Sequence, residues 1–172
     1  LYTGDYSKAE ETATKIISKS SIYSLLTDLN SVYLKNSKEA IWQLMVTAPL
    51  RNSRIGFDLI LTSSPSSVSL RPSIVNEFEN SDKRLNSWIN SITIGSQRYY
   101  FPFKYKIGQN ATSVVEYTMI FRLSEMYLIR SEARGRQSNL LGAYQDLNAI
   151  RLRAGLIPLV PTTLTDLLNQ VN

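Results

Sequence analysis

Two helical stripes of apolar residues, separated by one short break, constrain the fold of this chain more than any other feature. Apolar residues recur at spacings of three and four in each stripe, as on one face of an α-helix. The first stripe is Met119, Leu123, Met126, Ile129 and Ala133, and the second is Leu140, Ala143, Tyr144, Leu147, Ile150 and Ala154. Ser138 or Asn139 can cap the second helix, and Gly155 can end it in the left-handed conformation. The pattern predicts two antiparallel helices between Met119 and Gly155.

A second copy of part of this pattern lies near the start of the chain. Ala9, Ala13 and Ile16 match Ala143, Leu147 and Ile150 at a constant offset of 134 residues. A small residue followed by apolar residues at these spacings is typical of the second helix of a tetratricopeptide repeat, where it lets two helices approach closely. The alternative interpretation is that two amphipathic helices share a stripe by chance.

The segment between the two copies predicts strands and loops. Residues 39–46 alternate in part and predict a strand that Pro49 ends, and residues 98–106 predict a second strand with Pro102 at a sheet edge. Residues 50–73 read as a long loop. We therefore predict a mainly α fold, a tetratricopeptide-like α-α superhelix with a small strand-and-loop insertion. It would form a single domain over residues 1–172, with a helical repeat at 1–35, the insertion at 36–115, and the helical hairpin and the start of a further helix at 116–172.

Composition excludes several classes of function. The chain of 172 residues has no Cys and no His, which removes thiol chemistry, the usual zinc ligands and a Ser-His-Asp nucleophile. The formal charge of +5 comes from scattered Lys and Arg rather than from a basic stripe, so we expect no nucleic-acid partner. No apolar run approaches the ~18 residues of a membrane span. We predict no catalytic residues, no cofactor and no metal site.

Several motifs, in order along the chain, resemble those of one family. Residues 121–133 read FRLSEMYLIRSEA, which resembles the SusD/RagB helix "RLAEMYLIRAEA", and residues 146–156 read DLNAIRLRAGL, which resembles its "DLNxIRxRAGL". Shorter matches are Leu70-Arg71-Pro72-Ser73, Asp82-Lys83-Arg84 and Lys104-Tyr105. The chain is similar to a middle or truncated portion of such a protein.

The resemblance implies a non-enzymatic nutrient-binding protein of the outer membrane, facing the cell exterior. SusD/RagB proteins are surface lipoproteins of Bacteroidetes that capture nutrients, chiefly glycans. The implied partners are an oligosaccharide and a SusC-like TonB-dependent transporter. The family's lipid-bearing cysteine, which would anchor the protein in the membrane, is not in this chain. Two alternatives remain open: a peptide or glycoprotein ligand in the same family, and a tetratricopeptide adaptor that binds a protein partner.

The charged residues of the two long motifs predict structural pairs rather than chemistry. Spacing allows Arg122 to meet Glu125, and Glu132 to meet Arg136, on a helix face. Hydrolysis of a glycan needs two carboxylates that face each other across a cleft, and Glu125, Glu132 and Asp146 do not predict this arrangement. We expect Asn148 and Arg151 to hold backbone groups, and Asp82 to pair with Arg84.

A sugar site needs an exposed aromatic face and planar polar groups. Loops on a rigid helical frame are the natural place for it. Trp42 alternates with Ile41 and Leu44 and is expected in the core. The candidate ligand-binding residues are therefore Arg51, Asn52, Arg54, Phe57, Arg71 and Trp88.

Overall fold

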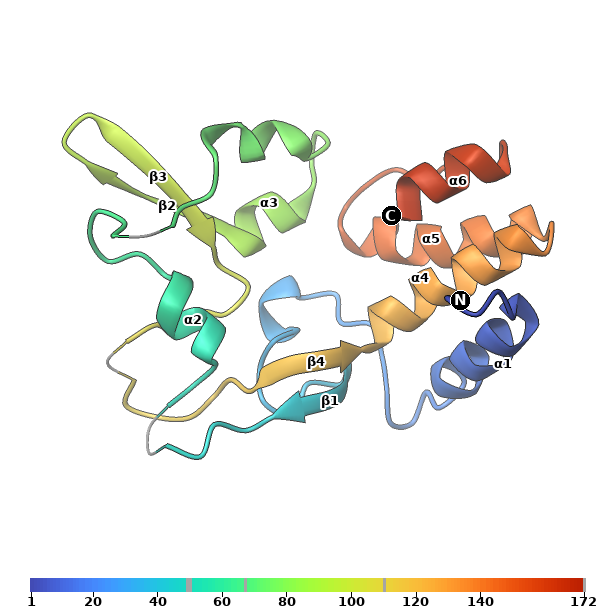
Figure 1. The fold of residues 1–172 in the computed structure, drawn as a ribbon, viewed down its shortest axis with the longest axis horizontal. Coiled ribbons are helices and arrows are strands. Elements are labelled where there is room, and N and C mark those ends of the chain that lie inside the picture. Colours follow the sequence, from blue (N-terminus) through green and yellow to red (C-terminus); the bar gives the residue numbers. More distant parts are fainter. Residues whose placement is uncertain (49–50, 67, 110, 172) are drawn as a thin grey trace.

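The computed structural model describes residues 1–48, 51–66, 68–109 and 111–171. Helices account for 41% of the chain and strands for 15%, which confirms the mainly α prediction. Four helices gather on one side of the molecule, and the shorter elements lie on the other side, with one two-stranded sheet running between them (Figure 1). Pro49, which we expected to end the first strand, lies outside the described residues.

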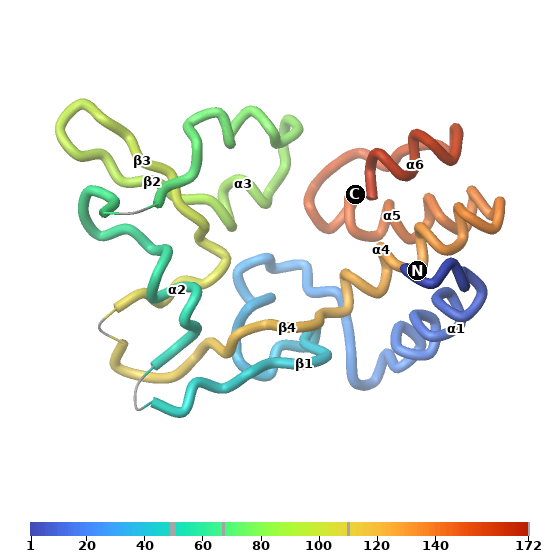
Figure 2. The backbone as a smooth tube through the Cα atoms, in the orientation of Figure 1, coloured from blue at the N-terminus to red at the C-terminus, as the bar shows by residue number. Residues whose placement is uncertain are grey.

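The helical body consists of α1 (Tyr6–Ile17), α4 (Leu123–Arg136), α5 (Leu140–Arg153) and α6 (Leu164–Val171). Helix α4 lies between α1 and α5 and contacts both (Figure 2). Ala143 of α5 is fully buried, as expected of the small residue in its stripe. Ala9, which takes the same place in the first copy, is only partly buried, and Ala13 is the buried residue of α1. A second group of buried side chains, Tyr144, Leu147 and Leu167, joins α5 to α6.

The ends of these helices follow the local signals in the sequence. The Asp5 carboxylate accepts a hydrogen bond from the backbone N–H of Lys8, and the Asn139 side chain accepts one from that of Gly142. Gly155 has a φ of +82°, and the N–H of Leu156 returns to the Arg151 carbonyl at 3.0 Å. This is the left-handed helix end that Gly155 predicted.

The start of the helical hairpin was predicted wrongly. Met119 lies in strand β4 (Thr118–Arg122), and α4 begins only at Leu123. Strand β4 pairs antiparallel with β1 (Ala40–Leu44). The apolar residues of β4 continue the helical spacing by coincidence, and the pairing with a strand almost 80 residues away in the sequence decides the conformation.

A second antiparallel sheet consists of β2 (Ile89–Ile94) and β3 (Gln97–Pro102). Pro102 stands at the end of β3 in a sheet of two strands, which fits the edge position predicted for it. The predicted strand over residues 98–106 extends too far, since β3 ends at Pro102. Trp88 closes helix α3 (Lys83–Trp88) instead of opening an extended segment.

The predicted long loop at residues 50–73 contains a helix. Helix α2 (Arg54–Leu59) begins after Ser53, whose hydroxyl accepts a hydrogen bond from the N–H of Ile55. A Cβ at Gly56 would lie 2.5 Å from the carbonyl oxygen of Ile107, so a glycine is needed for this close approach. Two short 3-10 helices also lie in the described part of the chain, η1 (Leu29–Ser31) and η2 (Pro72–Glu77), and Pro72 occupies the first turn of η2.

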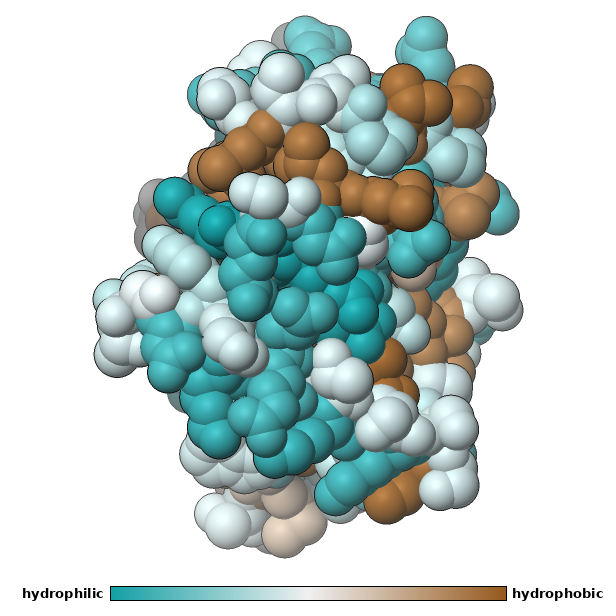
Figure 3. Space-filling model, turned by 90° about the vertical axis from the view of Figure 1, so that its right-hand side faces the viewer, coloured by the Kyte–Doolittle hydropathy of each residue, from teal (hydrophilic) through white to brown (hydrophobic). Residues whose placement is uncertain are grey.

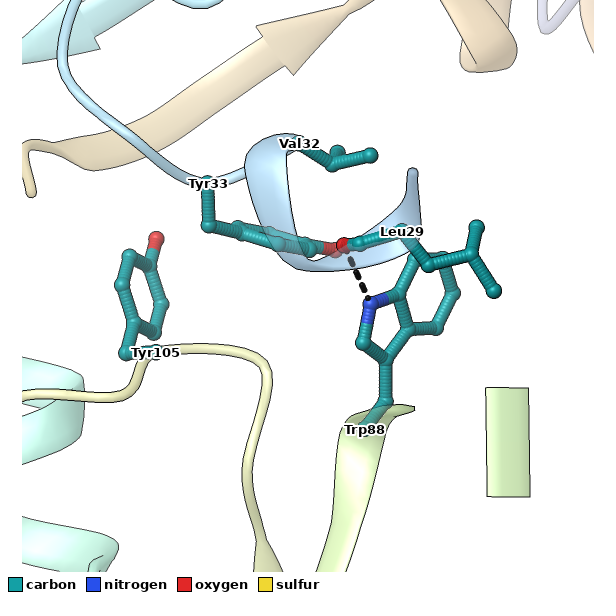
Figure 4. Close-up of a cluster of buried hydrophobic side chains, with 5 residues drawn as sticks. All are labelled: Leu29, Val32, Tyr33, Trp88 and Tyr105. Carbon is teal, nitrogen blue, oxygen red and sulfur yellow. Dashed lines mark hydrogen bonds between the residues drawn. The ribbon is translucent and has the colours of Figure 1, made fainter. Parts of the chain in front are cut away.

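The core of the strand-and-loop side is a cluster of aromatic and aliphatic side chains. Tyr33 lies between Trp88 and Tyr105, with ring centroids 5.8 and 5.1 Å away. The Trp88 indole N–H donates to the Leu29 carbonyl at 3.0 Å (Figure 4). Val32 completes the cluster. These residues come from η1, α3 and the segment after β3, so the cluster holds three separate elements together.

Polar contacts near the end of α5 connect this side to the helical body. Arg153 of α5 donates to the fully buried carboxylate of Glu39, next to β1. Arg151 forms two hydrogen bonds to Glu79, at 2.6 and 2.9 Å. The N–H of Lys83 donates to the Ala154 carbonyl at 2.8 Å. These three contacts tie one end of α5 to residues far away in the sequence.

The surface of the helical body is largely hydrophilic, with one hydrophobic band across it (Figure 3). Large apolar side chains that are exposed include Leu141 and Leu152 of α5. Among the described residues, none of the helices has the length and the hydrophobicity needed to cross a membrane.

Candidate sugar-binding surface

An exposed aromatic pair lies on the β1–β4 sheet, and we call it the aromatic platform. Trp42 of β1 and Phe121 of β4 are register partners, with ring centroids 5.8 Å apart and an angle of 39° between the rings. Trp42 is 50% exposed and Phe121 is 45% exposed. Leu44, Met45 and Ile120 are exposed nearby in the same strands or directly after them. The platform offers two aromatic rings to solvent.

The prediction that Trp42 belongs to the core was wrong. The sheet has only two strands, and the pairing of β1 with β4 shifts register on both sides of Trp42. Such irregularities change which face each side chain occupies, so simple alternation does not locate a residue. Trp42 therefore pairs with Phe121 on the surface.

A pocket of about 380 Å³ lies between α2, the segment after β3, and the β4–α4 junction. Its walls combine apolar, aromatic and charged side chains, and we call it the cationic pocket. It is lined by Tyr33, Ile55, Gly56, Pro102, Lys104, Tyr105, Met119, Ile120, Arg122 and Glu125. The Tyr105 hydroxyl accepts a hydrogen bond from the N–H of Met119 at 2.8 Å, which fixes one wall. Volume and lining are those of a small-molecule site.

Three of the predicted site residues form a cluster at the start of α2. The guanidinium carbon of Arg51 lies 4.4 Å from the centroid of the Phe57 ring, and that of Arg54 lies 5.3 Å from it. Arg54 also pairs with Asp58 at 2.7 Å. Both arginines are exposed and Phe57 is partly buried. The cluster adjoins the cationic pocket through its neighbours Ile55 and Gly56.

Asn52 and Trp88 do not provide the exposed groups expected of them. The Asn52 amide donates to the Ser113 carbonyl and accepts from the N–H groups of Val115 and Glu116, all at 2.8 Å. Trp88 is only 6% exposed. Both side chains are committed to internal contacts. The sequence alone does not show whether an asparagine is hydrogen-bonded inside the protein or whether a tryptophan lies in the core.

Arg71 is exposed and pairs with Glu77 at 2.5 Å. None of the six predicted residues lines the cationic pocket. The residues missed were Lys104 and Arg122. In the sequence, Lys104 stands in a short family signature with Tyr105, and the spacing of Arg122 to Glu125 predicted an ion pair. Neither signal points to a pocket.

The charged residues of the long motifs mostly form the structural pairs that were predicted. Asp146 accepts from Arg130 at 2.6 and 2.8 Å and from Arg134 at 2.9 Å. Glu132 pairs with Arg136 at 3.1 Å, and Asp82 pairs with Arg84 at 2.6 Å. One pair was wrong: within the described residues, Arg122 and Glu125 form no ion pair, because Arg122 belongs to a strand.

Asn148 and Arg151 hold backbone groups, as expected. Asn148 exchanges two hydrogen bonds of 2.8 Å with the backbone of Leu159, and Arg151 donates to the Ile157 carbonyl at 3.1 Å. They fix the segment that leads from α5 to α6. In the part of the chain that the structure describes, His, Cys, Asp and Glu do not gather into a group that would hold a metal ion.

These features define a tetratricopeptide-like helical frame that carries a strand-and-loop region with an exposed aromatic pair and a pocket. The sequence pattern of the SusD family matches residues 67–171, and the chain belongs to this family. No curated protein matches the sequence.

Solved structures of the same fold support this placement. A SusD superfamily protein from Parabacteroides distasonis is 22% identical, with a TM-score of 0.72 over 96% of this chain and 42% of its own. A SusD-like carbohydrate binding protein from Bacteroides vulgatus is 19% identical, with a TM-score of 0.77 over 99% of this chain and 38% of its own. Surface glycan-binding protein A from Bacteroides thetaiotaomicron, in complex with laminarihexaose, is 19% identical, with a TM-score of 0.66 over 98% of this chain and 48% of its own. The chain spans less than half of each of these proteins.

Proposed function

We propose that the protein containing this chain captures oligosaccharides at the outer face of the outer membrane and delivers them to a SusC-like TonB-dependent transporter. Membership of the SusD family supports the role. The single structural observation that carries the proposal is the aromatic platform of Trp42 and Phe121. A contiguous group of exposed apolar side chains on a surface often marks a binding site.

The chemistry of sugars fits such a surface. One face of a pyranose ring carries C–H groups that pack on an aromatic ring, and its hydroxyl groups need planar donors and acceptors. Arg51 and Arg54 present exposed guanidinium groups beside Phe57 and can donate to hydroxyl groups. We propose that the platform and this cluster share an oligosaccharide.

The proposed role is capture without bond breaking. Two of the three carboxylates in the long motifs are held in ion pairs, Asp146 by two arginines and Glu132 by Arg136, so only Glu125 would be left to act on a sugar. A hydrolytic pair would require two carboxyl groups facing one sugar at a fixed separation.

The test is calorimetric titration of the intact protein against a panel of neutral and acidic oligosaccharides, comparing wild type with Trp42→Ala and Phe121→Ala. Loss of one stacking surface should weaken binding about tenfold, since apolar burial and ring contact together contribute about 1–2 kcal/mol. Leu152→Ala is the matched control, because it removes a side chain that is equally exposed on α5. Its affinity should equal that of wild type.

Two results would contradict the proposal. Binding of peptides with no binding of any glycan would point to a peptide ligand. Glycan binding that both platform variants retain in full would show that the site lies elsewhere. Delivery is tested separately, by co-purification of a large β-barrel transporter with the tagged protein from detergent-solubilised membranes.

A further inference from the structure

Two cations of the cationic pocket share the same aromatic neighbours, and neither forms an ion pair with any residue that the structure describes. The ammonium nitrogen of Lys104 lies 5.4 Å from the ring centroid of Trp88 and 6.0 Å from that of Tyr33. The guanidinium carbon of Arg122 lies 5.5 and 5.8 Å from the same two rings. Two like charges thus stand against one pair of rings.

One nitrogen of the Arg122 guanidinium, Nη1, is buried and lacks an acceptor within the part of the chain that the structure describes. A buried guanidinium N–H without an acceptor costs the full desolvation of that group. Arg122 lines the pocket, where a bound ligand could supply the missing acceptor.

Neighbouring carboxylates are committed to other cations. One oxygen of Glu39 accepts from Arg153, while its other oxygen is buried without a hydrogen-bond partner among the described residues. Asp82 is paired with Arg84. Glu125 also lines the pocket, but it is exposed and forms no ion pair with Lys104 or Arg122. The interior of the pocket therefore has an excess of positive charge.

The electrostatic strain is visible at Lys104. Lys104 is an exposed residue, yet its ammonium nitrogen lies 5.4 and 6.0 Å from the centroids of the two rings. This desolvation, with the nearby charges of Arg122 and Arg84, lowers the pKa of Lys104 below its usual value. An anion placed between Lys104 and Arg122 would offset the repulsion between the two cations and favour the charged form of Lys104.

We infer that the cationic pocket binds the anionic oxygen group, carboxylate or sulfate, of a charged sugar residue. The inference rests on the proposed function, which makes the ligand an oligosaccharide. A guanidinium matches the two oxygens of such a group, and Lys104 adds a second charge. Ile55, Pro102 and Tyr105 supply apolar walls for the sugar ring. The platform would then hold neutral units, and the pocket would select a charged unit.

The experiment compares ligands that differ only in charge. An oligogalacturonate, its fully methyl-esterified form and a sulfated oligosaccharide are each titrated into the intact protein by calorimetry. We expect at least one acidic ligand to bind about tenfold or more tightly than the neutral ester, with the advantage decreasing as salt is added. Which acidic ligand is preferred distinguishes carboxylate from sulfate.

Variants assign the preference to the pocket. Lys104→Met and Arg122→Met should each reduce the affinity for the acidic ligand about tenfold and that for the ester much less, because each removes one charged hydrogen-bond donor. Arg122→Lys keeps the charge and should retain most of the preference even if Arg122→Met folds poorly. Glu125→Gln should strengthen acidic binding. Lys19→Met removes an exposed charge outside the pocket and should change nothing.

The possible failures are distinguishable. Equal binding of the acidic ligands and the ester would overturn the inference and leave glycan capture intact. A preference that survives in both methionine variants would place the anion site elsewhere and would also overturn it. Absence of binding to every oligosaccharide, neutral or acidic, would refute the proposed function and the inference together.

Discussion

At the scale of single residues, the strongest polar arrangement is the group around Asp146. Its carboxylate is almost fully buried in α5 and accepts three hydrogen bonds from Arg130 and Arg134 of α4. Arg134 also reaches Glu10 of α1 at 2.8 Å. The Asp146 carboxylate therefore links α5 to α4, and Arg134 links α4 to α1. Asp146 stands in the family motif because it holds these helices together.

Asp146→Asn should lower the free energy of unfolding by about 3 kcal/mol, because it leaves two partly buried arginines without their counter-charge. Urea denaturation at neutral pH measures the loss. Asp58→Asn is the control, since it breaks an Asp–Arg pair at an exposed site and should cost less than about 0.5 kcal/mol. Equal losses in the two variants would show that burial does not matter here.

At the scale of elements, the close approach of α4 and α6 depends on a missing side chain. A Cβ at Gly135 would lie 2.3 Å from a methyl carbon of Leu167, and Leu167 is fully buried. The methyl group cannot move aside, because it packs among Ala143, Tyr144 and Leu147 of α5. The glycine therefore sets the distance between the two helices.

Gly135→Ala should destabilise the protein by about 1–3 kcal/mol through overpacking. The sign is informative, because alanine ordinarily stabilises a helix interior by ~0.5–1 kcal/mol relative to glycine. Thermal unfolding of Gly135→Ala, Leu167→Ala and the double variant tests the cause. The double variant should lose less stability than the sum of the two single losses, because the smaller side chain at position 167 removes the clash with the new Cβ. Simple additivity would argue against the contact.

At the scale of the whole molecule, few polar contacts connect the helical body to the strand-and-loop side. The bidentate pair of Arg151 and Glu79 is one of them, and the hydrogen bond from Arg151 lowers the pKa of Glu79 below its ordinary value of 4.5. Because the folded protein favours the charged form of this carboxylate, the pair contributes its full stabilisation at pH values above the ordinary pKa of 4.5. The contribution is lost as pH falls through the lowered pKa.

Glu79→Gln should therefore reduce stability by up to about 1 kcal/mol at pH 7, a small value because Glu79 is 55% exposed. The difference from wild type should decrease below pH 4.5 and disappear once the pH lies below the lowered pKa of Glu79. Denaturant titrations at several pH values measure it, with Glu77→Gln as the exposed control. A difference that grows on acidification would reverse the sign that we assign to the pair.

The sequence by itself determined the helical frame and the family. Stripes, caps and the glycine at 155 are local signals, and a helix closes its hydrogen bonds within a few residues, so α5 could be predicted nearly to both ends and α4 to its C-terminal end. The pairing of Asp82 with Arg84 and of Glu132 with Arg136 was accessible for the same reason. The division of the chain into a single domain with an insertion stays a prediction.

Only the tertiary structure decided which aromatic and charged side chains face solvent. Trp42 and Trp88 exchanged their expected places, because exposure depends on segments that pack from far along the chain. Helix α2 was missed since Gly56 reads as a loop residue until its contact with Ile107 is known. Lys104 and Arg122 are 18 positions apart and meet at the same rings only after β4 pairs with β1. Sites assembled in this way have no local periodicity, and so the binding surface had to come from the fold.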